Sequence, residues 1–139
     1  MGQFIVLSAA LACLSCTCPR SRKARARRCP SLFRVAAGRG DDQGRIWCRF
    51  GLRNMGVTHA GDNFQNSGHH HLLVDVNEPL DLNEPIPQDK THLHFGAGQT
   101  ETRIELPPGK HTLQLVLGDA KHYPFNPPLV SDKITIRIK

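Results

Sequence analysis

The sequence predicts an all-β protein, an antiparallel immunoglobulin-like β-sandwich. Short runs of alternating apolar side chains recur after residue 48, and turns rich in Gly, Pro and Asn separate them. No segment has a helical period long enough to define a helix. A chain of 139 residues is enough for one ordinary domain but not for two separate cores. A barrel with the same number of strands is the alternative.

The chain changes character at Cys48. Residues 1–48 hold nine Lys or Arg and two acidic residues, a net charge of +7, whereas residues 49–139 hold nine and ten, a net charge of −1. All five cysteines lie at or before Cys48, so the later part folds without a disulfide of its own. The basic character of the whole chain therefore comes from its first third, and we expect no nucleic-acid partner for the folded part.

Residues 1–18 are expected to be an export signal. The apolar run at residues 4–14 has the length of a signal-peptide core and is shorter than the roughly 20 residues of a membrane span, so we expect a periplasmic or secreted protein without a transmembrane segment. The first three residues lack the usual Lys or Arg, and Cys13 leaves lipid attachment open. The CxxCxC run at Cys13, Cys16 and Cys18 lies at the end of this signal, which disfavours a metal or redox site there.

Residues 19–48 are rich in Arg and Gly and have no period of 2 or 3.6, which predicts a disordered segment. A basic arm for nucleic acid or anionic lipid is an alternative. A third hypothesis is that residues 16–48 are read out of frame. Back-translation of residues 32–46 with freely chosen codons, read one nucleotide later, permits YFVSPRDGATIKGE, a strand followed by a Gly turn. The domain would then lack its first strand in frame, and the coding nucleotides would decide this.

The first half of the expected domain, which begins at residue 49, contains two strands and two loops. RFGLR at 49–53 is a brief strand, and the Gly- and Asn-rich residues 54–68 are a loop. Residues 70–76 alternate, with Leu72 and Val74 on one face and His71 and Leu73 on the other, which predicts a strand buried mainly on one side. Residues 77–90 contain three prolines and cannot continue a ladder.

The second half contains four more expected strands, at 91–95, 100–106, 111–117 and 133–139. The first two surround a Gly-Ala-Gly turn at 96–98. The sequence PPGK at 107–110 is a tight turn, because Pro sets the first bend and Gly supplies a positive φ. Alternating Leu in 111–117 and alternating Ile in 133–139 are expected to face the core, and residues 118–132 are a loop.

Residues 50–139 resemble the small exported bacterial proteins of domain-of-unknown-function family 4399. The resemblance is carried by GHHHLLVD at 68–75, PIP at 85–87, HLHFGAGQTE at 92–101 and PPGKHTLQL at 107–115, together with Gly118-Asp119, His122 and Pro127-Pro128. It implies an exported β domain and brings no list of catalytic residues. Members normally begin with a strand similar to YFVSP followed by DGA, which this chain has only in the offset reading.

All eight histidines lie after Cys48. Neutral imidazole is a common ligand of Zn, Cu and Ni. On strands, His92 and His94 share a face, while His70 points away from His69 and His71. A plain hairpin that pairs residue 76 with His92 would place His70 near Gly98 and roughly 13 Å from His94, which keeps the two groups apart.

An immunoglobulin-like order brings histidines together differently, because the loops 54–68, 96–99 and 118–131 would emerge at the same end. His111 belongs to the opposite end. The candidate ligands of a Cu or Zn ion at the loop end are His59, His69, His70, His94, His122 and Asp119. The absence of Cys there disfavours a closed structural zinc site. Each histidine could also be a hydrogen-bonding residue that fixes a loop to a strand end.

The sequence thus indicates a non-enzymatic exported domain that binds a metal ion or a small polar ligand through histidine-bearing loops and requires no cofactor. One alternative is a module for protein or glycan contact at the cell envelope, with structural histidines. Another is a metal-dependent hydrolase with an open site. Asp75 and Asp119 have no nucleophile at a diagnostic spacing, and Gly96-Ala97-Gly98 leads into a strand, which excludes a phosphate-binding loop.

Overall fold

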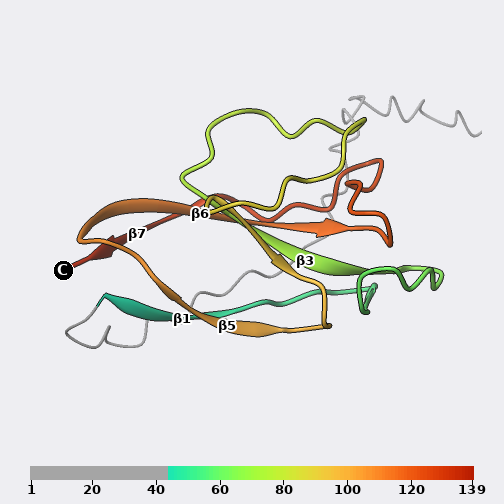
Figure 1. The fold of residues 1–139 in the computed structure, drawn as a ribbon, viewed down its shortest axis with the longest axis horizontal. Coiled ribbons are helices and arrows are strands. Elements are labelled where there is room, and N and C mark those ends of the chain that lie inside the picture. Colours follow the sequence, from blue (N-terminus) through green and yellow to red (C-terminus); the bar gives the residue numbers. More distant parts are fainter. Residues whose placement is uncertain (1–43) are drawn as a thin grey trace, which may run out of the picture.

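The computed structural model describes residues 44–139, and these form seven strands and no helix (Figure 1). The prediction of an all-β domain is therefore confirmed. The strands are β1 (Arg45–Arg49), β2 (Gly56–Val57), β3 (Ser67–Val74), β4 (His92–Phe95), β5 (Glu101–Glu105), β6 (Gly109–Gly118) and β7 (Ile134–Ile138).

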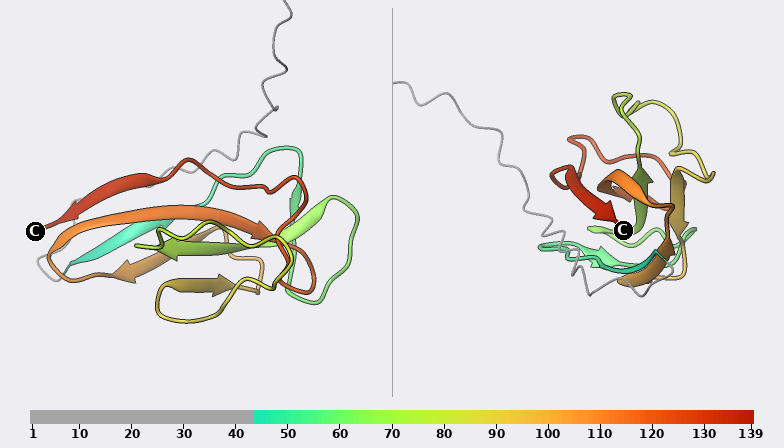
Figure 2. Two further views of the ribbon diagram at one scale, coloured as in Figure 1. Left: turned by 90° about the horizontal axis from the view of Figure 1, so that it is seen from above. Right: turned by 90° about the vertical axis from the view of Figure 1, so that its left-hand side faces the viewer.

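The strands form two sheets. β1 and β5 make a two-stranded antiparallel sheet, and the order of the five-stranded sheet is β2-β3-β6-β7, with β4 also paired to β3. β6 occupies one edge of β3, while β2 and β4 follow one another along its other edge. The two sheets are separate layers in Figure 1 and in the end-on view of Figure 2. This arrangement agrees with a β-sandwich, and an immunoglobulin-like strand order stays a prediction.

The main hydrophobic core lies between these layers. β1 contributes Ile46 and Cys48, and β5 contributes Ile104, each buried because alternate side chains of a strand face the same side. The larger sheet contributes the side chains that face β1 and β5: Leu72 and Val74 of β3, Phe95 of β4, Leu113 and Leu115 of β6, and Ile138 of β7.

The opposite face of the larger sheet is also covered. The loop 77–90 runs over this outer face, away from β1 and β5 (Figure 1), and its Ile86 packs with Leu73 and Val116 in a second, smaller core. All residues of β3 from Gly68 to Val74 are therefore buried. The expectation that this strand is buried mainly on one side was wrong, because the proline-rich loop covers its second face.

Two details of the first strands also differ from the expectation. The strand expected at 49–53 lies four residues earlier, at Arg45–Arg49, because Ile46, Cys48 and Phe50 alternate into the core while the Trp and Arg side chains between them point outward. The segment expected to be one loop at 54–68 contains β2, whose Gly56 and Val57 pair in parallel with Ser67 and Gly68. The other five expected strands are present, with ends shifted by no more than three residues.

Three predictions concern residues outside the described part of the chain. They are the export signal at 1–18, the lipid attachment at Cys13, and the disordered or out-of-frame segment at 19–48, of which only the last few residues are described. Within residues 44–139, no helix is long and apolar enough to cross a membrane.

Candidate metal centre

His69 and His71 come from β3 and lie on the outer face of the larger sheet. They are two residues apart on a strand, so their side chains point to the same side as Leu73, whereas His70 points to the inner core. Both imidazoles are fully buried, with no exposed surface. His69 Nε2 and His71 Nε2 are 3.0 Å apart.

His94 comes from the neighbouring strand β4, directly opposite His71. The antiparallel register pairs His71 with His94 and Leu73 with His92, so both β4 histidines face the outer side. The ring centroid of His94 lies 4.9 Å from that of His69 and 5.0 Å from that of His71. The register thus places three imidazoles side by side on one face of the sheet.

His122 completes the group from the loop that follows β6. Asp119 shapes this loop: its Oδ1 accepts hydrogen bonds from the N–H groups of Lys121 and Tyr123, at 2.8 and 2.9 Å. His122 has φ of 70°, a left-handed conformation that turns its ring back over the sheet. Its Nδ1 lies 3.1 Å from His69 Nε2.

Two glycines leave room for the rings. A Cβ atom at Gly118 would lie 3.0 Å from His71 Nε2 and 3.1 Å from its Cδ2, and a Cβ atom at Gly96 would overlap the ring of His94. Any other residue at either position would push an imidazole out of its present place.

The four histidines form a compact group of nitrogen donors. One ring nitrogen from each of His69, His71, His94 and His122 lies within 4.8 Å of the other three. Four imidazoles around Zn²⁺ at about 2.0 to 2.1 Å would have nitrogens about 3.4 Å apart. The shortest contacts, 3.0 and 3.1 Å, already have about this spacing, and the widest pair would have to close by roughly 1.4 Å. The donor set therefore fits one small transition-metal ion.

Hydrogen bonding alone does not satisfy these rings. An imidazole nitrogen has either one N–H or one lone pair, so His69 Nε2 can bond to His71 or to His122 but not to both. His69 Nδ1, His71 Nδ1 and His94 Nε2 are buried without a hydrogen-bond partner in the described part of the chain. Buried polar atoms are normally paired, so the convergence of His71 Nε2 and His122 Nδ1 on the single hydrogen-bonding position of His69 Nε2 points to a ligand.

The environment favours the neutral form of three of the rings, His69, His71 and His94. Burial, reinforced by the neighbouring imidazoles, lowers the pKa of His69 to about 4 and that of His71 to about 3. Burial and His122 also lower the pKa of His94. The carboxylate of Asp119 acts in the opposite direction on His69, so it is a nearby negative charge. Neutral imidazoles offer the lone pairs that a metal ion needs.

The structure brings together three of the six residues expected to form the site, His69, His94 and His122. His59 is exposed and lies 3.6 Å from Asp62. His70 lies on the inner face, where it donates from Nδ1 to the carbonyl of Gln99, and burial lowers its pKa. Asp119 is not a member of the group and instead shapes the loop that carries His122.

His71 takes the place in the group that had been expected of His70. The register differs from that of the plain hairpin considered above: His70 pairs with Phe95 and not near Gly98, because Leu73 and not residue 76 pairs with His92. Alternation along β3 was the signal that could have found His71, since it faces the same side as His69. As expected, His111 lies at the other end of β6, where it contacts Asp75 at 2.7 Å.

The comparisons with known proteins identify one family. No curated protein and no solved structure gave a match. The model of one family, described as a domain of unknown function (DUF4399), matches residues 48–139, which include all four histidines of the group and both glycines beside them. The chain therefore belongs to the DUF4399 family.

Proposed function

We propose that this chain is an exported, non-enzymatic protein that binds one divalent transition-metal ion, Zn²⁺ or Cu²⁺, through His69, His71, His94 and His122. The observation that carries the proposal is the convergence of four imidazoles whose nitrogens lie within 4.8 Å of one another. Imidazole is a preferred ligand of both ions, and Cu²⁺ stands highest among first-row divalent metals.

The donor set favours binding over catalysis. Catalytic zinc sites keep a coordination position open for water or substrate, whereas four protein ligands close the tetrahedron. His69 and His71 are also fully buried, which leaves no room for a substrate on that side. A closed site suits capture, storage or transfer of the ion.

The ligand type also suits the proposed compartment. Histidine keeps its ligand chemistry under oxidising conditions, in which thiols are lost to disulfides. The apolar run at residues 4–14 supports export. Sequencing the N-terminus of the protein from a periplasmic or extracellular fraction tests this part, and an intact N-terminus in the cytoplasmic fraction would contradict it.

The test of metal binding uses the full chain with Cys13, Cys16, Cys18 and Cys29 replaced by Ser, so that these thiols cannot bind the ion. Cys48 stays, because it is buried and burial raises its pKa to about 11, which keeps the thiol protonated. Zn²⁺ and Cu²⁺ are titrated by calorimetry against a competing chelator. We expect one ion per chain and, for Cu²⁺, an electron paramagnetic resonance spectrum of nitrogen ligation.

Three variants identify the ligands. His94→Ala and His122→Ala are both at the partly exposed side of the group and should each weaken binding at least tenfold, while His59→Ala, an exposed histidine outside the group, should leave it unchanged. Affinity no tighter than about 1 mM for either ion, or equal losses in all three variants, would overturn the proposal.

A further inference from the structure

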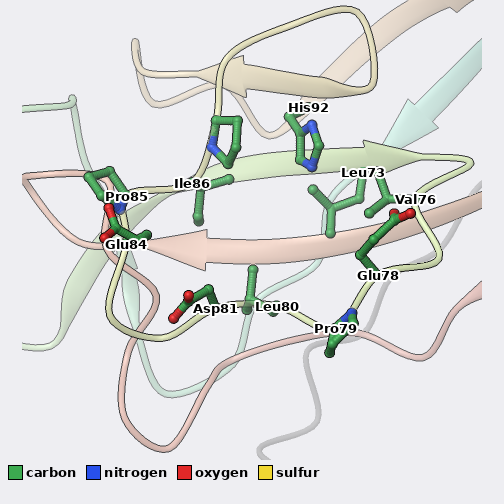
Figure 3. Close-up of a pocket in the computed structure, with 11 residues that line it drawn as sticks. Leu73, Val76, Glu78, Pro79, Leu80, Asp81, Glu84, Pro85, Ile86 and His92 are labelled. Carbon is green, nitrogen blue, oxygen red and sulfur yellow. The ribbon is translucent and has the colours of Figure 1, made fainter.

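A hollow lies on the outer face of the larger sheet, on the same side as the histidine group. Its volume is about 370 Å³, within the range of small-molecule sites. It lies between β3 and the loop 77–90 (Figure 3). Leu73 and His92, which line it, are the next pair along the β3–β4 ladder after His71 and His94.

The floor of the hollow is apolar. Leu73 and Ile86 are buried, and Val76 and Leu80 are partly buried against them. Figure 3 shows Leu73, Leu80 and Ile86 in the middle of the hollow. A hydrocarbon chain laid on this floor would remove apolar surface of both the ligand and the protein from water, which favours binding.

The rim carries negative charge at two separated places. Glu78 lies on one side of the apolar floor, while Asp81 and Glu84 lie on the other (Figure 3). Among residues 44–139, no Lys or Arg lines the hollow. Lys133 contacts one lining residue, since its Nζ donates to the carbonyl of Val76 at 2.6 Å.

The shape of the loop is fixed before any ligand arrives. Pro79, Pro85 and Pro87 restrict its backbone. Asp81 Oδ1 accepts the N–H of Asn83 at 2.8 Å, and the N–H of Ile86 donates to the carbonyl of His122 at 2.8 Å. A hollow formed in advance costs less conformational entropy on binding.

We propose that this hollow binds a linear organic dication, an alkane chain with an ammonium group at each end. The chain would lie on the apolar floor, one ammonium would face Glu78, and the other would face Asp81 and Glu84. A single ammonium would leave one acidic border unmatched, and a dicarboxylate would be repelled at both. The proposal does not depend on metal binding.

The test is a calorimetric titration of the full chain at pH 7 with straight-chain diamines of four to eight carbons. We expect saturable binding with an optimum at one length. The monoamine of the best length should bind about two to five times more weakly, the usual effect of one exposed ion pair, and the dicarboxylate should not bind. Raising the salt concentration from about 0.05 to about 0.5 M should weaken the binding.

Variants and a spectrum locate the site. Glu78→Gln and Glu84→Gln should each weaken diamine binding about two- to fivefold, and Glu105→Gln, on β5 of the other sheet, should have no effect. Methyl signals of Leu73 and Ile86 should shift during an NMR titration. Equal binding of the dicarboxylate, the same loss in Glu105→Gln, or no diamine binding at about 20 mM would overturn the proposal.

Discussion

Replacing His71 by Leu separates a ligand from a structural residue. His71 is fully buried, its Nδ1 has no hydrogen-bond partner in the described part of the chain, and Leu73 already occupies the next position on the same face. Leu has a similar volume and no polar atoms. The substitution therefore removes an unsatisfied buried group, which ordinarily costs about 1 to 3 kcal/mol, without opening a large cavity.

We therefore expect the metal-free His71→Leu protein to be more stable than the metal-free wild type by about 1 to 3 kcal/mol. For a domain of this size, 1 kcal/mol moves the thermal midpoint by about 4 to 8 °C, so a rise of at least about 4 °C should be visible by circular dichroism. Excess metal should show the opposite order. An ion at about 100 times its Kd adds about 2.7 kcal/mol to the wild type, and the variant should gain far less.

The assay is thermal unfolding of both proteins with a chelator and with excess Zn²⁺. If the chelated variant melts below the chelated wild type, His71 contributes to the fold by its own contacts, and the reasoning from its unpaired nitrogen is refuted. If both proteins gain equally from Zn²⁺, the ion binds elsewhere.

Three further predictions concern acid stability, space and the far end of the sheet. Burial lowers the pKa of His69 to about 4 and that of His71 to about 3 in the folded chain, whereas histidine in the unfolded chain has a pKa near 6.5. The free energy of unfolding of the metal-free protein should therefore have its full value above about pH 6.5 and be lower by about 2 kcal/mol per ring at pH 5. A thermal midpoint that stays constant from pH 7 to pH 5 would contradict this. Gly118→Ala should weaken Zn²⁺ binding by roughly tenfold in a chelator competition, because its Cβ would lie 3.0 Å from His71 Nε2; unchanged affinity would show that the ring has room to move. His111 donates from both ring nitrogens, to Asp75 and to the carbonyl of Pro107, so the pKa of His111 is raised and that of Asp75 is lowered. Asp75→Asn should therefore lower the free energy of unfolding most between about pH 4 and 6.5, where both groups are charged, and less at higher pH. Urea unfolding that shows the same loss at pH 9 as in that window would refute the pairing of charges.

Much of the fold could be predicted because alternation is a local property. The leucines of β6 and the isoleucines of β7 mark their strands directly, and the prolines of 77–90 mark a break. β1 was misplaced because its inward residues are separated by Arg and Trp side chains in a basic region. β2 has two residues, Gly56 and Val57, and its pairing with β3 depends on contacts that no local pattern records.

The site was predicted in part, because strand faces follow from the sequence but register does not. Asp75 ends β3: it adopts φ of 57°, and its carboxylate accepts the N–H of Thr112 at 2.7 Å. The ladder to β4 therefore runs from Leu73 and His92, and this sets His94 beside His71. The position of His122 depends on a left-handed backbone in a loop, which the sequence marks only by the preceding Gly118-Asp119.

The run of three histidines in β3 serves two different layers at once. Two imidazoles face the outer side, where the four histidines meet, and the middle one packs against Phe50, with ring centroids 5.1 Å apart, in the hydrophobic interior. A shift of this strand by one residue against its neighbours would exchange its two faces. The proposed metal site would then receive one imidazole instead of two, and the hydrophobic core would receive two instead of one. An ion bound during folding would thus stabilise only the native register of β3, so metal binding would disfavour chains with a shifted strand pairing.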